Sequence, residues 1–246
     1  MKRMYAAACA AWCLTALVAA AANTAVAPEP REKQEGWMAR HEQMNERVKQ
    51  GNADLVFIGD SITHGWEGAG KPVWDHYYAD RNAVNLGIGG DRTQHVIWRL
   101  ENGNIDGISP KVAVVMIGTN NHKDNSAEEI SEGVTAIVRR LRNGLPDTKV
   151  LLLAIFPRGD KPEKIVEKLN QANTLIADLA ADPMVTFLDL GPAFRDLQGQ
   201  VPESLMPDLL HPNEAGYQVW ASSMEPVLAP LLGVPEKAPA ADHAAE

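Results

Sequence analysis

The stretch that decides the fold is Leu55-Val56-Phe57-Ile58-Gly59-Asp60-Ser61, where a short apolar run ends in a glycine and two polar residues. An apolar run of this length, without alternation, is typical of a strand buried on both faces of a sheet. Similar runs follow along the chain at residues 83–86, 112–117, 150–155 and 185–188. We expect these segments to form the strands of one sheet.

Stretches with helical spacing lie between the expected strands. They cover residues 93–101, 126–143 and 162–181, with further helices expected at 37–49 and 213–232. Ser126 and Glu129 match a capping box at the start of one of them. Strands that alternate with helices predict right-handed crossovers and a parallel sheet covered on both faces. The expected fold class is therefore α/β.

The N-terminal residues 1–27 have the features of a secretory signal. A basic pair is followed by a stretch rich in Ala, Leu and Val, and both cysteines of the chain lie here. Cleavage would follow Ala22 or Ala27, and an uncleaved anchor helix is the alternative. We expect export to the bacterial periplasm or beyond, without stable membrane insertion after cleavage.

The rest of the chain is expected to be one domain. A length of 246 residues suits a single large α/β domain. Residues 28–36 are rich in proline and charge and are expected to be a flexible leader. The domain itself covers residues 37–234, and residues 235–246 are expected to be a loose tail.

The net charge of the chain indicates which classes of binding partner to expect. The formal net charge is −9, and loss of Lys2 and Arg3, the only charged residues in 1–27, takes it to −11. Nucleic-acid binders usually carry a basic face, so nucleic acid is not an expected partner. An acidic surface also gives no long-range attraction to anionic membranes.

Four polar clusters are expected to meet at one edge of the sheet. In open parallel sheets, ligands bind beyond the carboxyl ends of the strands. Ser61 follows the first strand, Gly89-Gly90-Asp91 the second, and Gly118-Thr119-Asn120-Asn121 the third. Asp208 and His211 lie in the loop before the last helix. Their convergence is a stronger indication than any one cluster.

These residue types suit nucleophilic catalysis at an acyl carbonyl. A serine becomes a good nucleophile when an imidazole takes its proton and a carboxylate orients that imidazole, which gives Ser61, His211 and Asp208 these roles. The oxyanion formed on attack needs preorganised donors, and the Ser61 and Gly90 backbone N–H groups and the Asn120 amide could supply them. Each residue also has a purely structural interpretation, as a helix cap, a satisfied histidine or a turn. We find no metal-ligand cluster and predict no cofactor.

The motifs Gly59-Asp60-Ser61-Ile62, Gly89-Gly90, Gly118-Thr119-Asn120 and Asp208-x-x-His211 resemble the four blocks of the SGNH (GDSL-type) hydrolases. Ile62 stands where the family's name has Leu. Residues 85–100 are similar to the catalytic subunits of platelet-activating factor acetylhydrolase Ib. The resemblance implies a three-layer αβα sandwich with a five-stranded parallel sheet, flavodoxin-like in order. It implies the same catalytic and oxyanion roles.

Two classes of substrate are compatible with the sequence. A secreted serine esterase for short acyl groups, above all acetyl, could act on O-acetylated carbohydrate or on a phospholipid-like ester. A non-catalytic binding module on the same fold is the alternative of another class. A homodimer is one assembly that the sequence leaves open. The residues that could line the substrate pocket are Ile62, His64, Asp91, Asn121, His122 and Arg158.

Overall fold

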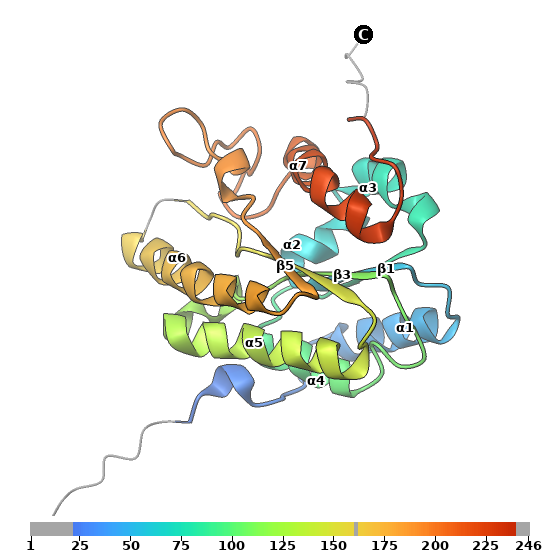
Figure 1. The fold of residues 1–246 in the computed structure, drawn as a ribbon. Helices are drawn as coiled ribbons and strands as arrows, with labels where there is room; N and C mark the ends of the chain where they lie inside the picture. The colour runs from blue at the N-terminus through green and yellow to red at the C-terminus, as the bar shows by residue number, and fades with distance from the viewer. Residues whose placement is uncertain (1–21, 160–161, 240–246) are drawn as a thin grey trace, which may run out of the picture.

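A five-stranded parallel sheet forms the centre of the molecule (Figure 1). This computed structural model describes residues 22–159 and 162–239. The strand order is β2-β1-β3-β4-β5, and every neighbouring pair is parallel. The α/β class and the five-stranded parallel sheet are thus confirmed. The strands are β1 (Leu55–Gly59), β2 (Ala83–Gly87), β3 (Val112–Met116), β4 (Lys149–Leu153) and β5 (Val185–Leu188).

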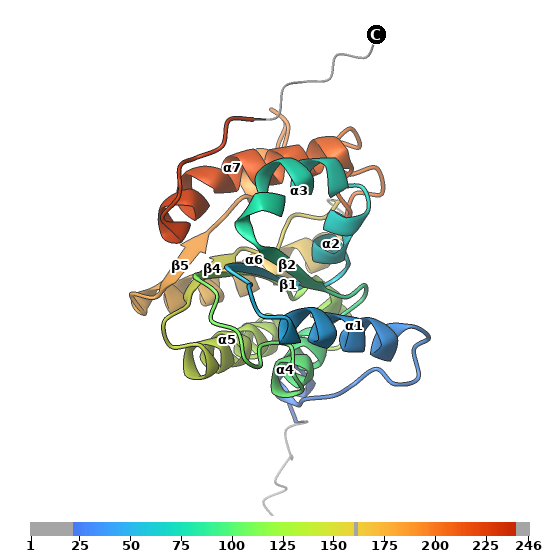
Figure 2. The same cartoon turned by 90° about the vertical axis from the view of Figure 1, so that its right-hand side faces the viewer.

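Helices cover both faces of the sheet, as Figures 1 and 2 show. One face carries α1 (Trp37–Lys49), α4 (Thr93–Glu101), α5 (Ala127–Gly144) and α6 (Glu163–Ala177). The other carries α2 (Ser61–His64), α3 (Lys71–Tyr77) and α7 (Glu214–Leu232). The five expected helices are present within a few residues of their expected bounds. The sequence interpretation missed α2 and α3, because a helix of two turns or fewer is too short to show a helical period.

Alternate side chains of each central strand supply two separate cores. In β1, Val56 and Ile58 join the cluster beneath α1, α4 and α5, while Leu55 and Phe57 join the cluster beneath α3 and α7. A strand covered on both sides must be apolar at every position. This is why the run at 55–58 does not alternate.

The strand order creates a switch point beside β1. From β1 the chain crosses to β2 on one side, and from β2 it returns to β3 on the other side. In open parallel sheets, ligands bind at the carboxyl ends of the strands beside such a switch point. Ser61 follows β1 and Asn120 follows β3, so both lie at this switch point.

The segment before α1 is attached to the domain. Ala25, in the short 3-10 helix η1 (Thr24–Val26), is fully buried, and Thr93 Oγ1 donates to its carbonyl oxygen at 2.8 Å. Residues 28–36, expected to be a flexible leader, make defined contacts, among them Glu29 N to Gln94 O at 3.3 Å. Residues 1–21 of the expected signal segment lie outside the described residues.

The expected tail, which the structure describes up to residue 239, also contacts the domain. Lys237 N donates to Glu225 Oε1 at 2.8 Å, and Lys237 Nζ pairs with Asp80 at 2.6 Å. The remainder of the expected tail, residues 240–246, lies outside the described residues. Over residues 22–159 and 162–239, each helix is too short or too polar to span a bilayer.

Candidate active site

Ser61 stands on a sharp turn between β1 and α2. A Cβ at Gly59 would come within 2.4 Å of Met116 O and 2.1 Å of Thr63 Oγ1, so only glycine fits at the end of this strand. Asp60 caps α2, because its Oδ1 accepts a hydrogen bond from Ile62 N at 3.0 Å. Ser61 is therefore the first helical residue and lies at the carboxyl edge of the sheet.

Aromatic side chains pack against α2 and link it to α7. Tyr217 OH donates to Ile62 O at 2.7 Å, and a Cβ at Gly65 would lie 2.0 Å from that hydroxyl oxygen. Trp66, in the 3-10 helix η2 (Gly65–Glu67) that follows α2, is fully buried and packs against Tyr217 with ring centroids 4.5 Å apart. The helix that carries Ser61 is thus tied to α7.

The loop before α7 carries the imidazole and the carboxylate. Ser61 Oγ lies 2.9 Å from His211 Nε2, and His211 Nδ1 lies 2.6 Å from Asp208 Oδ2. The other oxygen, Asp208 Oδ1, accepts from the backbone N–H of Leu210 at 3.1 Å and of His211 at 2.7 Å. Burial acts to raise the pKa of Asp208, but these hydrogen bonds outweigh it and lower the pKa below its usual value. A charged Asp208 can therefore hold His211 with its Nε2 toward Ser61.

The glycine loop after β2 lies against the serine. A Cβ at Gly89 would be 3.9 Å from Ser61 Cβ, and Gly90 has φ +76°, in the left-handed region that favours glycine. The turn is closed by a hydrogen bond from Asp91 N to Ile88 O at 3.2 Å. This arrangement brings the Gly89–Gly90 peptide close to Ser61.

Asn120 approaches the Ser61 turn from the 3-10 helix η4 (Thr119–Lys123), after β3. Its Nδ2 donates to Asp91 O at 2.9 Å and lies 3.4 Å from Asp60 Oδ2. The second contact is long for a hydrogen bond. One hydrogen of the amide is therefore held by Asp91 O, and the other, which makes only the long contact, is the one that a developing oxyanion could accept.

Asp60 is a buried acid beside the nucleophile. Burial raises its pKa to about 7, and the charge of Asp91 adds to this, whereas the Ile62 N–H and His211 act in the opposite direction. With no exposed surface, the carboxyl has little water to stabilise its charged form. Its protonation therefore changes in the neutral range.

This raised pKa predicts how stability depends on pH. The folded state holds the Asp60 proton more tightly than the unfolded state. The stabilisation from the protonated carboxyl is therefore complete below about pH 4 and is lost as the pH rises toward 7. Each pKa unit corresponds to about 1.4 kcal/mol. We expect the free energy of unfolding of Asp60→Asn to fall less between pH 4.5 and 7.5 than that of the wild type. Urea unfolding at several pH values measures this, and two identical profiles would contradict the raised pKa.

Two polar residues expected to line the substrate pocket belong to the interior instead. Asp91 is fully buried and pairs with the fully buried Arg99 at 2.8 Å. The Asn121 side chain is also buried, and its amide nitrogen donates to Thr93, Gln94 and Asn125. Their hydrogen-bonding groups are used within the protein, so both residues serve the framework and do not face a substrate.

The other four expected pocket residues differ in exposure and contacts. Ile62 is 1% exposed and belongs to the core beneath α3 and α7, so it does not line the rim either. His64 is half-buried, with Nδ1 3.8 Å from the position of a Cβ on Gly89, and burial lowers its pKa. His122 Nδ1 lies 2.7 Å from Thr119 O. Arg158 Nη1 is 3.3 Å from Thr119 Oγ1, and the next residue hydrogen-bonds to Leu209 O at 2.8 Å. His64, His122 and Arg158 are thus the polar groups of this set at the rim.

The sequence interpretation missed the residues that hold the Asp91 carboxylate. Arg99 donates to it from α4, and Trp37 Nε1 donates to Asp91 Oδ1 at 2.7 Å from α1. Arg99 also donates to Leu86 O at 3.0 Å and lies 3.3 Å from Gly59 O, at the ends of β2 and β1. An arginine among the buried apolar residues Val96, Ile97 and Leu100 of α4 was the available signal.

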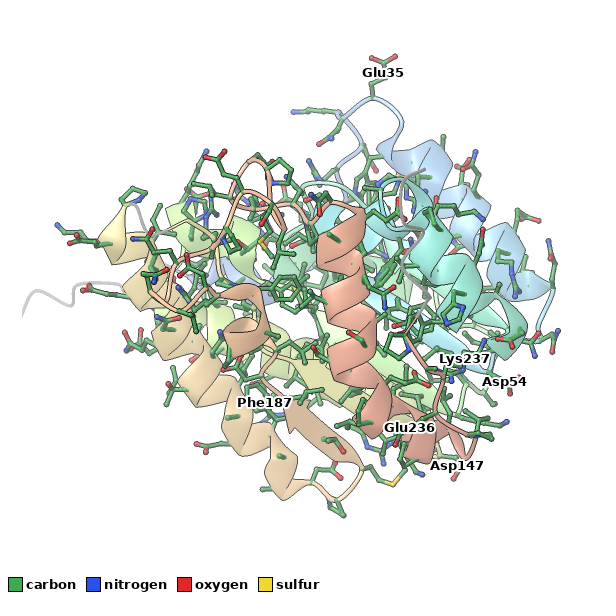
Figure 3. All side chains as sticks on the ribbon, turned by 90° about the horizontal axis from the view of Figure 1, so that it is seen from above. Glu35, Asp54, Asp147, Phe187, Glu236 and Lys237 are labelled. Carbon is green, nitrogen blue, oxygen red and sulfur yellow. The ribbon has the colours of Figure 1, made fainter. Side chains whose placement is uncertain are left out.

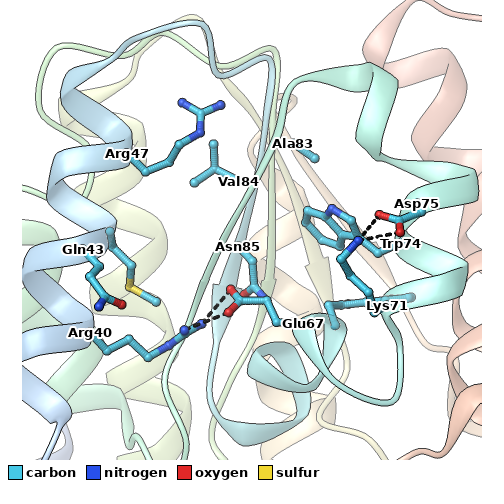
Figure 4. Close-up of a pocket in the computed structure, with 12 residues that line it drawn as sticks. Arg40, Gln43, Arg47, Glu67, Lys71, Trp74, Asp75, Ala83, Val84 and Asn85 are labelled. Atoms are coloured by element: carbon cyan, nitrogen blue, oxygen red, sulfur yellow. Dashed lines mark hydrogen bonds and ion pairs between the residues drawn. The ribbon is translucent and has the colours of Figure 1, made fainter.

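A separate pocket of about 310 Å³ lies between α1 and α3, beside the free edge of β2 (Figure 4). Four of its five charged side chains pair with each other: Arg40 with Glu67 at 2.8 Å, and Lys71 with Asp75. None of the predicted site residues lines it. This pocket is therefore distinct from the group of residues around Ser61.

Comparison with known proteins places the chain in a family. Residues 57–219 match the model of the GDSL-like Lipase/Acylhydrolase family. Human platelet-activating factor acetylhydrolase IB subunit alpha1 is 38% identical over 217 residues, covering 85% of this chain and 91% of that protein. The mouse subunit alpha2 is 35% identical over 214 residues, with 85% and 92% covered.

Solved structures share the fold. A GDSL-like lipase from Bacteroides thetaiotaomicron superposes with a TM-score of 0.62 at 17% identity, over 79% of this chain and 96% of that chain. An acetylxylan esterase from Geobacillus stearothermophilus gives a TM-score of 0.59 at 21% identity, over 75% and 96%. By its family match and its relatives, this chain is an ester hydrolase of the GDSL-like lipase/acylhydrolase family.

Proposed function

We propose that this chain is an exported serine esterase that removes short acyl groups, above all acetyl, from O-acetylated carbohydrate. The observation that carries the catalytic part is the contact chain from Ser61 Oγ through the His211 ring to Asp208, with distances of 2.9 and 2.6 Å. Export is inferred from the composition of residues 1–27, and fractionation of cells that produce the full chain tests it.

In the proposed reaction, His211 Nε2 takes the Ser61 proton while Oγ attacks the ester carbonyl carbon. The oxyanion accepts hydrogen bonds from the N–H groups of Ser61 and Gly90 and from the Asn120 amide. The tetrahedral intermediate then breaks its bond to the alcohol, which leaves with the proton from His211. Water, deprotonated by the same imidazole, releases the acid and restores Ser61.

A short acyl group fits the surface near Ser61. A long acyl chain needs a contiguous apolar surface to bind. Within the described residues, the exposed large hydrophobic side chains are Leu175, Leu197 and Leu209. Of these, only Leu209 lies in the loop that carries Asp208 and His211. The acetylhydrolase relatives at 35–38% identity also favour acetyl.

The alcohol part is inferred from the polar rim. His64, His122 and Arg158 can meet hydroxyl or charged groups. Together with export, this favours an acetylated carbohydrate. The alternative is a phospholipid-like acyl ester, favoured by the relatives named as platelet-activating factor acetylhydrolase subunits.

A substrate panel separates the two alcohol classes. Acetate release is measured from acetylated xylan, from peracetylated sugars and from a phospholipid with acetyl at one glycerol oxygen, with Ser61→Ala as the blank. We expect the acetylated carbohydrates to give the higher kcat/KM, and p-nitrophenyl acetate to exceed the octanoate ester by about 10-fold or more. A phospholipid rate above both carbohydrate rates would replace the first proposal with the alternative.

A further inference from the structure

The segment before α1 is anchored to the domain at both of its ends. Near its start, Ala25 is buried and accepts a hydrogen bond from Thr93 Oγ1 at 2.8 Å. Just after its end, Trp37 Nε1 donates to Asp91 Oδ1 at 2.7 Å. Figure 2 shows the loop between these points, in blue, beside α1 and α4. The anchors hold residues 26–36 near the loop that follows β2.

Arg31 reaches from this segment to the glycine loop. Its Nη1 donates to Gly89 O at 2.8 Å and to Asp91 Oδ1 at 3.1 Å, and its Nη2 donates to Gln34. The guanidinium lies 3.0 Å from the position that a Cβ on Gly90 would take. Glu35, at the bend of the segment, points away from the domain (Figure 3). The contacts of Arg31 with Gly89 and Asp91, in contrast, direct its side chain inward, toward the loop that follows β2.

The contact with Gly89 O bears directly on the Gly90 N–H. The carbonyl of Gly89 and the N–H of Gly90 belong to one planar peptide unit, so holding the oxygen sets the direction of the N–H. Glycine on both sides allows this unit to rotate at low cost. A donor fixed on the carbonyl oxygen therefore limits a motion that the two glycines would otherwise permit.

The same loop also holds Asn120. Asp91 O accepts the hydrogen bond from Asn120 Nδ2 at 2.9 Å, while the Asp91 carboxylate is held by Arg99, Trp37 and Arg31. The Arg31 guanidinium contacts both ends of the loop, at Gly89 and at Asp91. It can therefore affect two oxyanion donors without touching the substrate.

We propose that Arg31 is a positioning residue that orients the Gly89–Gly90 peptide so that its N–H faces the oxyanion. The proposal rests on the proposed function, since the direction of this N–H matters only if an oxyanion forms beside Ser61. Arg31 acts on the transition state and not on ground-state binding. Its loss therefore lowers kcat and leaves KM nearly unchanged.

The test replaces Arg31 in the full chain and measures kcat and KM with p-nitrophenyl acetate. Arg31→Met keeps the aliphatic stem and removes the donors. We expect kcat to fall by about 10- to 100-fold, less than for loss of a donor itself, with KM within about twofold. Arg31→Lys, which can still donate to Gly89 O, should regain part of the loss. Circular dichroism of each variant checks that kcat refers to folded enzyme.

Arg40→Met is the matched control. Arg40 also donates to a backbone carbonyl near this loop, Gly87 O at 2.8 Å, but does not contact the Gly89–Gly90 peptide. Its kcat should stay within about threefold of the wild type. An unchanged kcat in Arg31→Met, a loss confined to KM, or an equal loss in Arg40→Met would overturn the proposal. If Arg31→Met does not fold, an unchanged kcat in Arg31→Gln overturns it instead. Wild-type activity in Ser61→Ala would signal failure of the proposed function itself.

Discussion

Ser61→Ala is expected to lower kcat for p-nitrophenyl acetate by about 10⁴- to 10⁶-fold. The change removes the hydroxyl that lies 2.9 Å from His211 Nε2 and would form the acyl-enzyme. The backbone N–H of residue 61 and the cap from Asp60 to Ile62 N do not involve the hydroxyl, so the fold and part of the oxyanion site should persist. Steady-state kinetics with the purified variant, alongside circular dichroism, measure both effects.

Ser222→Ala is a matched control for the loss of a serine hydroxyl. Ser222 Oγ donates to Gln218 O within its own helix, at 2.8 Å. Its replacement should leave kcat within about twofold of the wild type. Equal rates for Ser61→Ala and the wild type would remove the esterase mechanism and favour a binding module on a hydrolase fold.

Asp208→Asn should reduce kcat by about 10⁴-fold. The asparagine Oδ1 can still accept from the Leu210 and His211 backbone N–H groups, so the loop should keep its shape. Its amide nitrogen, however, would face His211 Nδ1, where the carboxylate oxygen now accepts at 2.6 Å. Because the amide donates, the imidazole must carry its proton on Nε2. An Nε2–H cannot take the proton from Ser61.

The matched control for this change is Asp196→Asn. Asp196 Oδ1 also accepts from two backbone N–H groups, those of Gln198 and Gln200, each at 2.9 Å. The substitution there removes the same charge from a similar turn, and kcat should stay within about twofold of the wild type. A comparable loss of kcat in both variants would mean that net charge, and not the His211 tautomer, accounts for the effect.

The strands and longer helices could be predicted because each is marked locally. The apolar run at 55–58 has no polar position, as a strand covered on both faces requires, and Ser126 with Glu129 forms the expected capping box, with hydrogen bonds of 3.2 and 2.9 Å. Asp208 and His211 are close in sequence, so a single turn can hold both. Their meeting with Ser61 followed from the rule that ligands gather at the carboxyl ends of parallel strands.

The parts that were missed depend on contacts between distant segments. Arg31 lies in a stretch whose composition suggests disorder, and only the folded chain brings it to Gly89, 58 residues away. Asp91 stands at a strand end, where a substrate contact was expected, but Arg99 from α4 pairs with its carboxylate and takes it into the interior. Composition and spacing do not specify such side-chain partners.

Covalent labelling tests the central claim most directly. The full chain is treated with a fluorophosphonate, which phosphonylates an activated serine, and the modified peptide is identified by mass spectrometry. We expect one equivalent of label on Ser61, with loss of esterase activity in proportion, and no label in Ser61→Ala. Complete inactivation with the label on another residue, or an unlabelled chain that still cleaves p-nitrophenyl acetate, would contradict an acyl-enzyme at Ser61.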